Sequence, residues 1–443
     1  MKHIGHHTLF TPAMTAAMGR WQRAFYGVNR RPGSHPTALA PALTGTLAEL
    51  VTAELSLQIT GGSSAQWLQS QLEDFLPRLQ QAVQYAAAFG RCILRPLVRG
   101  DRITVELIPG DRFYPTRLRE DGTPLAGYFA DWRQAEGMEL LRLEGFDYDP
   151  EHRRLTLTNR AYRLDGDRVK REIPLDSLPD WQDLEPETVI EGVSGPLLGD
   201  LRMPFVGTVD PASRLPVSLW AGAEDSLVEF DRLWGEFLYE LHSGKRKRII
   251  ERQALPGLSG KPVPGAPGYQ DLATDTYLVL DPMEQQKPFD DYSPVLRTEE
   301  YLTGLKALLG LIETQCRLSP GTLRLEALTG SSQPATATEV VSRDKTTYHT
   351  CAAIQEQGVR PALKDLVEAM DTLGVLYGLA SQEDYALDIA FGDSIFEDTG
   401  AEFTRLMEMV KAGVLRPEKL LGWYFHTAEP EAYLPSQTGN AVM

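Results

Sequence analysis

Four consecutive cations are the strongest candidate for binding chemistry in this 443-residue sequence: Lys245, Arg246, Lys247 and Arg248. Adjacent Lys and Arg side chains could contact phosphate groups or dock an acidic partner. The alternative is a solvated helix C-terminus, where cations interact favourably with the helix dipole. The run is unusual because 61 Asp and Glu against 44 Lys and Arg give the chain a net charge of −17. That balance argues against a protein that binds nucleic acid over a broad surface, but not against one that lets DNA slide past.

Carboxylate pairs and histidines are weaker candidates for catalysis or metal binding. Asp290–Asp291 and the Asp147/Asp149 pair are expected in loops, where solvated turn residues explain them better than acid–base catalysis. In Phe391–Asp398, turn formation and capping of the next helix by Asp398 are favoured over metal binding. Histidines near the N-terminus could bind a metal, but a mobile terminus is the better interpretation. These histidines are His3, His6 and His7.

No familiar catalytic motif occurs in the sequence. The segment nearest to a phosphate-binding loop, Gly257–Lys261, is too short and is followed by proline, and there is no GxSxG, HExxH, CxxC or EF-hand pattern. We therefore predict a protein that is not an enzyme and that uses no cofactor or metal. Cys92, Cys316 and Cys351 have no paired spacing, which predicts buried free thiols and assembly in a reducing cytosol. No stretch approaches the roughly 20 apolar residues that span a bilayer, and the N-terminus lacks a secretory pattern.

Helices precede strands in the N-terminal half. Helical spacing of apolar residues predicts helices at 12–25, 43–55 and 64–89, the last divided by Pro77 and ended by Gly90. After Gly90 the period becomes two, which predicts a mostly antiparallel block that reaches about residue 175. The acidic stretch Pro174–Glu191 is expected to be an exposed loop. The expected strands are 91–98, 102–108, 125–130, 139–146, 154–162 and 168–173.

Two long helices flank a compact insert in the C-terminal half. The first helical pattern begins at Ser226 and extends to Ile250, and the second begins near Arg297. The insert between them is rich in Gly and Pro and contains one clear strand, Thr276–Leu280. Later elements are a loop at 319–334, a long helix at 335–380 kinked by Gly358 and Pro361, a strand at 385–390, and helices at 399–413 and 417–424. The chain is therefore predicted to be α+β.

Several local motifs occur along the chain in a fixed order. The early ones are Tyr85–Gly90, Ile93–Pro96, Ile108–Pro115 and Pro216–Trp220. The most specific are Leu318–Thr322, Thr336–Val340 and Thr346–Thr350, and the last are Ile389–Ile395 and Val410–Gly413. In this order they resemble the portal proteins of tailed bacteriophages, above all the minor-capsid/portal family of long-tailed phages. One departure is Ala335, where the family usually has Lys, so that charge is missing here.

The resemblance implies a portal fold and its division along the chain. The regions are the N-terminal part of the wing (1–225), stem helices (226–250 and 297–318), a clip (251–296), a tunnel loop (319–334), a long kinked helix with a wing strand (335–398), and a short helical crown with a tail (399–443). In the family, the clip faces the packaging motor and later the tail adaptor, and the tunnel loop lies against DNA. The implied site residues are the basic run and the tunnel-loop residues Arg324, Thr329, Gly330, Ser331, Ser332 and Gln333.

The resemblance also implies a structural subunit of a ring of about twelve copies, a channel at one capsid vertex for DNA packaging and ejection. Expected partners are double-stranded DNA, the terminase large subunit, the major capsid and scaffolding proteins and the head–tail adaptor, with no membrane. The expected location is the virion, and the host cytoplasm during assembly. A separate terminase ATPase would supply the energy, which agrees with the missing phosphate loop. Two alternatives stay open: a metal-dependent nucleic-acid-processing enzyme, and another oligomeric head–tail connector component.

Overall fold

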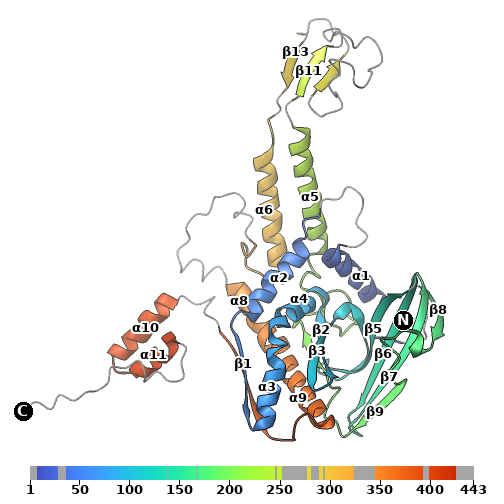
Figure 1. Cartoon of the computed structure of the whole chain (residues 1–443). Helices are drawn as coiled ribbons and strands as arrows, with labels where there is room; N and C mark the ends of the chain where they lie inside the picture. Colours follow the sequence, from blue (N-terminus) through green and yellow to red (C-terminus); the bar gives the residue numbers. More distant parts are fainter. Residues whose placement is uncertain are drawn as a thin grey trace, which may run out of the picture.

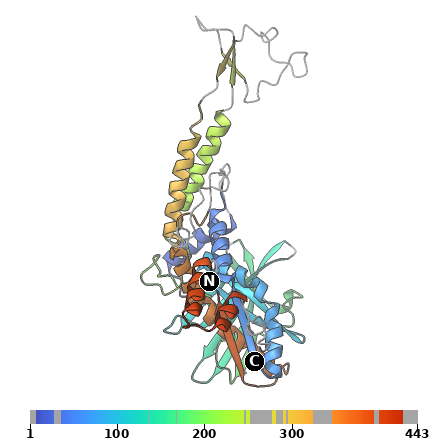
Figure 2. The same ribbon diagram turned by 90° about the vertical axis from the view of Figure 1, so that its left-hand side faces the viewer.

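The computed structural model shows a mixed α+β body from which two long helices rise side by side (Figure 1). A small sheet lies at the far end of these helices, and the view turned by 90° shows the same arrangement (Figure 2). The predicted α+β class is therefore confirmed. The structure describes residues 7–27, 36–135, 137–166, 168–244, 247–251, 277–280, 289–292, 295–323, 345–392 and 399–425.

Helices α1 to α4 pack into the main core of the body. Pro77 lies in a 3-10 turn, Leu76–Arg78, that separates α3 from α4 as predicted, because proline lacks the N–H that a continuing helix would need. Gly90 follows α4 with a φ of 80°, and a Cβ there would lie 2.6 Å from the Pro216 carbonyl oxygen, so glycine is required. The bounds are α1 (Pro12–Tyr26), α2 (Leu39–Thr52), α3 (Ser63–Glu73) and α4 (Leu79–Phe89).

Two antiparallel sheets follow, and all six strands predicted for this block are present. The smaller sheet has the order β10-β2-β3, and the larger has the order β4-β5-β6-β7-β8 with β9 paired to β7. Phe113, Phe129 and Phe146 pack together on the face of the larger sheet that meets the body. The bounds are β2 (Arg91–Arg99), β3 (Arg102–Pro109), β4 (Phe113–Leu118), β5 (Pro124–Ala135), β6 (Met138–Asp149), β7 (Arg154–Asp165), β8 (Arg168–Ile173), β9 (Glu187–Glu191) and β10 (Gly199–Arg202).

Two expectations for this half are wrong. Pro174–Glu191 is not simply an exposed loop, because β9 pairs with β7 and Trp181 is only 1% exposed, in a cluster with Leu140 and Ala161. The helix expected to reach residue 55 ends at Thr52, and Leu55–Gly61 is instead strand β1. Strand β1 pairs with β14 (Tyr385–Phe391), a partner more than 300 residues away that local periodicity cannot reveal.

The two long helices are α5 (Glu224–Ser243) and α6 (Thr298–Gln315), and here they are called the stem. The expected extension of α5 to Ile250 is wrong. The helix ends at Ser243, and Lys247–Glu251 is strand β11, paired with β12 (Tyr277–Leu280) on one side and β13 (Phe289–Tyr292) on the other. The β-branched Ile249 and Ile250 favour a strand, and two strand partners satisfy its backbone on both sides.

The long helix expected after the stem is irregular where Gly358 and Pro361 predicted a kink. Helix α8 (Lys345–Ile354) continues through a π-helical turn (Gln355–Val359) into α9 (Arg360–Leu376). A Cβ on Gly358 would lie 2.6 Å from the Arg202 carbonyl oxygen, so glycine lets this turn lie directly on β10. Helices α10 (Thr399–Lys411) and α11 (Pro417–Phe425) pack on each other near the C-terminus.

Candidate functional site

The predicted site residues are only partly covered by the structure. Lys245 and Arg246 lie outside the described residues, whereas the backbone of Lys247 and Arg248 belongs to β11. The interpretation of this run as a helix C-terminus is therefore wrong for Lys247 and Arg248. The tunnel-loop residues Arg324, Thr329, Gly330, Ser331, Ser332 and Gln333 lie outside the described part of the chain, as do His3, His6, Asp393, Ser394 and Asp398.

The carboxylate pairs lie in strands and not in the expected loops. Asp147 and Asp149 are two residues apart in β6, and Asp290–Asp291 belong to β13. The Asp147 carboxylate forms an ion pair with Arg117. Asp149 accepts hydrogen bonds from His152 and nearby backbone N–H groups, which lower its pKa. Within the described residues, no group of three or more His, Cys, Asp or Glu side chains could hold a metal ion.

Aromatic and aliphatic side chains hold the two stem helices together. Phe237 of α5 packs between Trp234 and Tyr301, with ring centroids 5.6 and 6.0 Å apart. Nearer the body, Leu305, Leu309 and Ile312 of α6 join the main core. At the outer end, Arg297 Nη2 lies 2.9 Å from Glu240 Oε2, and this hydrogen bonding lowers the pKa of Glu240. The stem is therefore a packed pair of helices whose outer end is tied by an exposed ion pair.

The stem is strongly acidic. Helix α5 has six Asp and Glu residues against one arginine, and α6 has three Glu against one lysine, which gives the pair a net charge of −7. Two helices thus carry a large part of the net charge of −17 of the chain. The three acidic residues Glu229, Asp225 and Glu236 are exposed, with Arg232 bonded to Glu229 and Glu236. Such a surface repels phosphate groups at short range.

A set of buried and partly buried hydrogen bonds, here called the α6 joint, attaches α6 to α8. Glu313 is 1% exposed, and its two carboxylate oxygens accept hydrogen bonds from the backbone N–H groups of Gly321 (2.7 Å) and Leu323 (2.6 Å). The Ser319 N–H donates to Thr347 Oγ1 over 2.8 Å, and the Thr347 N–H donates back to Ser319 Oγ over 3.3 Å. Ser319 therefore caps the first turn of α8 from a distant part of the chain.

The α6 joint brings together two segments that the sequence singled out separately. Ser319 and Gly321 belong to the motif Leu318–Thr322, and Thr347 belongs to Thr346–Thr350. Their reciprocal hydrogen bonds could not be deduced from spacing, because 28 residues separate the two partners. Cys316 and Cys351 are buried beside this joint, and burial raises the pKa of each thiol to about 12. The thiols therefore stay protonated near neutral pH, and the prediction of buried free cysteines is confirmed.

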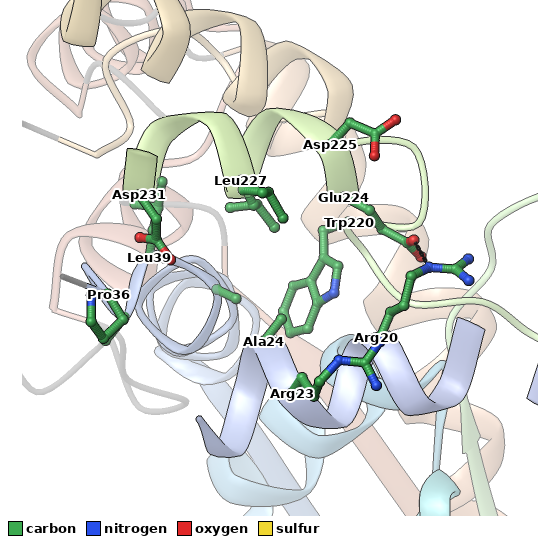
Figure 3. A pocket seen from close by; sticks show the side chains of 13 residues that line it. Arg20, Arg23, Ala24, Pro36, Leu39, Trp220, Glu224, Asp225, Leu227 and Asp231 are labelled. Atoms are coloured by element: carbon green, nitrogen blue, oxygen red, sulfur yellow. Dashed lines mark hydrogen bonds and ion pairs between the residues drawn. The ribbon is translucent and has the colours of Figure 1, made fainter. Parts of the chain in front are cut away.

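A second attachment, here called the α5 joint, surrounds a cavity of about 290 Å³ between α1, the start of α2 and α5 (Figure 3). Glu224 at the start of α5 forms an ion pair with Arg20 and accepts a 2.6 Å hydrogen bond from Trp21 Nε1. Farther along α5, Asp231 accepts hydrogen bonds from the Thr37 N–H and hydroxyl groups. These carboxylates hold the N-terminal segment against the stem. No sequence pattern predicts this cavity, since its walls come from segments that are far apart in the chain.

Comparisons with known proteins found matches among solved structures but not among protein families or curated proteins. No protein-family model matches the chain, and no curated protein matches it. Solved structures similar to it include chains from gene transfer agent particles: the neck of an empty particle with C6 symmetry, the virion of the native particle, and the neck of the native particle with C12 symmetry. Each is 12% identical over 94% of both chains, with TM-scores of 0.44, 0.41 and 0.42. Identity and TM-scores this low assign neither a family nor a function.

No described helix is long and apolar enough to cross a lipid bilayer.

Proposed function

We propose that the chain is a portal subunit, which forms a ring-shaped channel at one capsid vertex through which DNA is packaged and ejected. The observation that carries the proposal is the stem: two packed helices that rise from an α+β body and bear a small sheet at their far end (Figure 1). Copies of such a projection can stand side by side around an axis, because a head-to-tail contact repeated by rotation closes a ring. About twelve copies is the number that we propose.

The charge of the stem supports this function. If the stems surround the channel, their exposed acidic residues repel DNA phosphates and disfavour tight binding along the wall. Tight binding would hinder a duplex that has to move through. The body then forms the wing, and the sheet β11–β13 forms the clip that meets the terminase motor and later the head–tail adaptor. Helices α10 and α11 form a small crown.

Electron microscopy of the purified protein in negative stain tests the proposal. We expect end-on views of closed rings of about twelve subunits with a central channel wide enough for a DNA duplex. Closed rings without a channel would contradict the proposal. Monomers that also fail to assemble with scaffolding protein, and that cleave DNA when divalent metal is added, would favour the nucleic-acid-processing alternative.

The basic run has a separate test. Replacing Lys245, Arg246, Lys247 and Arg248 together with Gln should leave ring assembly intact and reduce DNA packaging, because local phosphate contacts or docking of an acidic partner would be lost. The matched control replaces exposed cations on β8, Lys170→Gln with Arg171→Gln, and should package normally. Unchanged packaging in the first variant would remove the basic run from the mechanism.

A further inference from the structure

Glu313 occupies an unusual position for a carboxylate. Its residue is 1% exposed, yet both of its oxygens accept hydrogen bonds from backbone N–H groups beyond the end of its own helix. A buried ionised group is costly unless such bonds compensate it, and hydrogen bonds to an ionised acceptor are roughly twice as strong as neutral ones. The result is that the chain leaving α6 is fixed back onto α6 at Gly321 and Leu323.

The turn held by Glu313 contains a strained residue. Arg317 has a φ of 60°, a left-handed conformation that non-glycine residues rarely adopt. Its carbonyl oxygen accepts a 2.7 Å hydrogen bond from Thr350 Oγ1, and its guanidinium lies 5.0 Å from the ring centroid of Phe205. Contacts from α8 and from the body thus hold a conformation that would otherwise relax. Strained residues that the surroundings fix in this way are concentrated at functional sites and switch regions.

We propose that Glu313 is a positioning residue, which makes α6 and α8 one rigid unit and so fixes the direction of the stem relative to the body. The proposal rests on the proposed portal function, because it assigns the task of the joint: to keep the stem helices aligned along the channel while DNA moves. The α6 joint connects the stem to α8, the π-helical turn and α9, which lies against β10. A displacement of α6 is therefore transmitted to the body instead of being absorbed in the turn.

The test compares Glu313→Gln with two controls. An amide oxygen can accept one of the two N–H groups, whereas the amide NH₂ faces the other donor, so the turn loses part of its support. Glu299→Gln, which changes an exposed carboxylate in the first turn of the same helix, controls for charge. Phe146→Leu, in the core of the large sheet, controls for a general loss of stability. The assay temperature is chosen so that Phe146→Leu and Glu313→Gln are each equally far below their own thermal midpoints.

Three measurements are made on the full-length chain: amide hydrogen exchange, ring formation in negative stain, and DNA content per particle after complementation. For Glu313→Gln we expect exchange at Gly321 and Leu323 to rise about tenfold or more, rings to form, and DNA content to fall. Both controls should keep normal exchange at these amides and normal DNA content. Unchanged exchange would overturn the role of Glu313 in holding the turn.

A fall in DNA content that is equal in Glu313→Gln and Phe146→Leu would overturn the positioning role, because loss of stability would then explain the defect. The proposed function has a separate test. If the wild-type chain forms no ring with a channel, both the portal function and the task assigned to the joint are overturned. The exchange measurement would in that case still decide whether Glu313 holds the turn. The two failures are therefore distinguishable.

Discussion

The stem is attached to the body at two joints that use the same chemistry in different surroundings. At the α5 joint, the side chain of Glu224 is 18% exposed and its partner Arg20 is 45% exposed. At the α6 joint, Glu313 is 1% exposed, and Ser319 and Thr347 in the same joint are also buried. Glu224 joins a helix start to a distant segment, whereas Glu313 joins a helix end to the turn that follows it. Water competes with the first, whereas the carboxylate of the second is itself buried.

This difference indicates that the stability of a joint depends on the burial of its carboxylate as much as on the number of its hydrogen bonds. A partly exposed ion pair contributes little, because solvent screens it and two long side chains lose freedom. A buried carboxylate that accepts two hydrogen bonds is worth more, since water competes less for its oxygens. We therefore expect α6 to fix the stem on the body and α5 to adjust around it. The following predictions test that contrast, from the largest effect to the smallest.

Removal of the buried carboxylate should have the largest effect. Glu313→Ala removes the acceptor of the Gly321 and Leu323 N–H groups, and we expect a loss of about 2–3 kcal/mol in the free energy of unfolding. Urea denaturation followed by circular dichroism measures it. Thr314→Ala, at the exposed neighbouring position, is the control and should change the value by less than about 0.5 kcal/mol. Equal midpoints for the two variants would contradict the contrast between the joints.

The α5 joint should be weaker and sensitive to salt. Glu224→Gln loses the ion pair with Arg20 and weakens the acceptor of Trp21 Nε1, for an expected loss of about 1–2 kcal/mol after allowance for solvent screening. In about 1 M salt this loss should shrink, whereas that of Glu313→Ala should stay nearly constant. Denaturation curves of both variants at low and high salt provide the comparison. A salt-independent loss at Glu224 would show that the two joints behave alike.

The cap on α8 should contribute less than Glu313. Ser319→Ala removes the acceptor of the Thr347 N–H and should cost about 1 kcal/mol, as is usual for a helix N-cap. Thr347→Ser keeps the hydroxyl group and is the matched control, with most of the stability retained. Thermal denaturation of the two variants is the measurement. If Ser319→Ala is as stable as the wild type, the α6 joint depends on Glu313 alone.

The smallest effect should be at the exposed outer end of the stem. Arg297 lowers the pKa of Glu240, so this pair stabilises the fold above the unfolded-state pKa, and the contribution is lost as the pH falls through the lowered folded-state pKa. Because Arg297 is 65% exposed and solvent screens the pair, Glu240→Gln should leave the thermal midpoint at neutral pH almost unchanged. It should remove only a small part of the decline in stability between about pH 5 and pH 3. A large change at neutral pH would mean that this end of the stem is buried in the assembly.

Local signals in the sequence were sufficient for most helices and strands. Helical spacing predicts α1 and the stem helices, and a period of two predicts β2, β3 and β5 to β8. Pro77 and Gly90 mark real boundaries, because a missing N–H and a left-handed φ act on the residue itself. These features depend on neighbours three or four residues away, so the sequence contains the needed information at short range.

Tertiary structure alone decided the end of α5, the partner of β1, the burial of Trp181 and both stem joints. Lys247–Glu251 becomes a strand because β12 and β13 lie on either side of it, although the helical pattern continues to Ile250. Glu313 looks like any polar residue of a helix until the chain turns back over it. The sequence therefore determined most helices and strands and marked the motifs Leu318–Thr322 and Thr346–Thr350. Only the folded path of the chain decided which polar groups are buried, and burial sets the strength of their interactions.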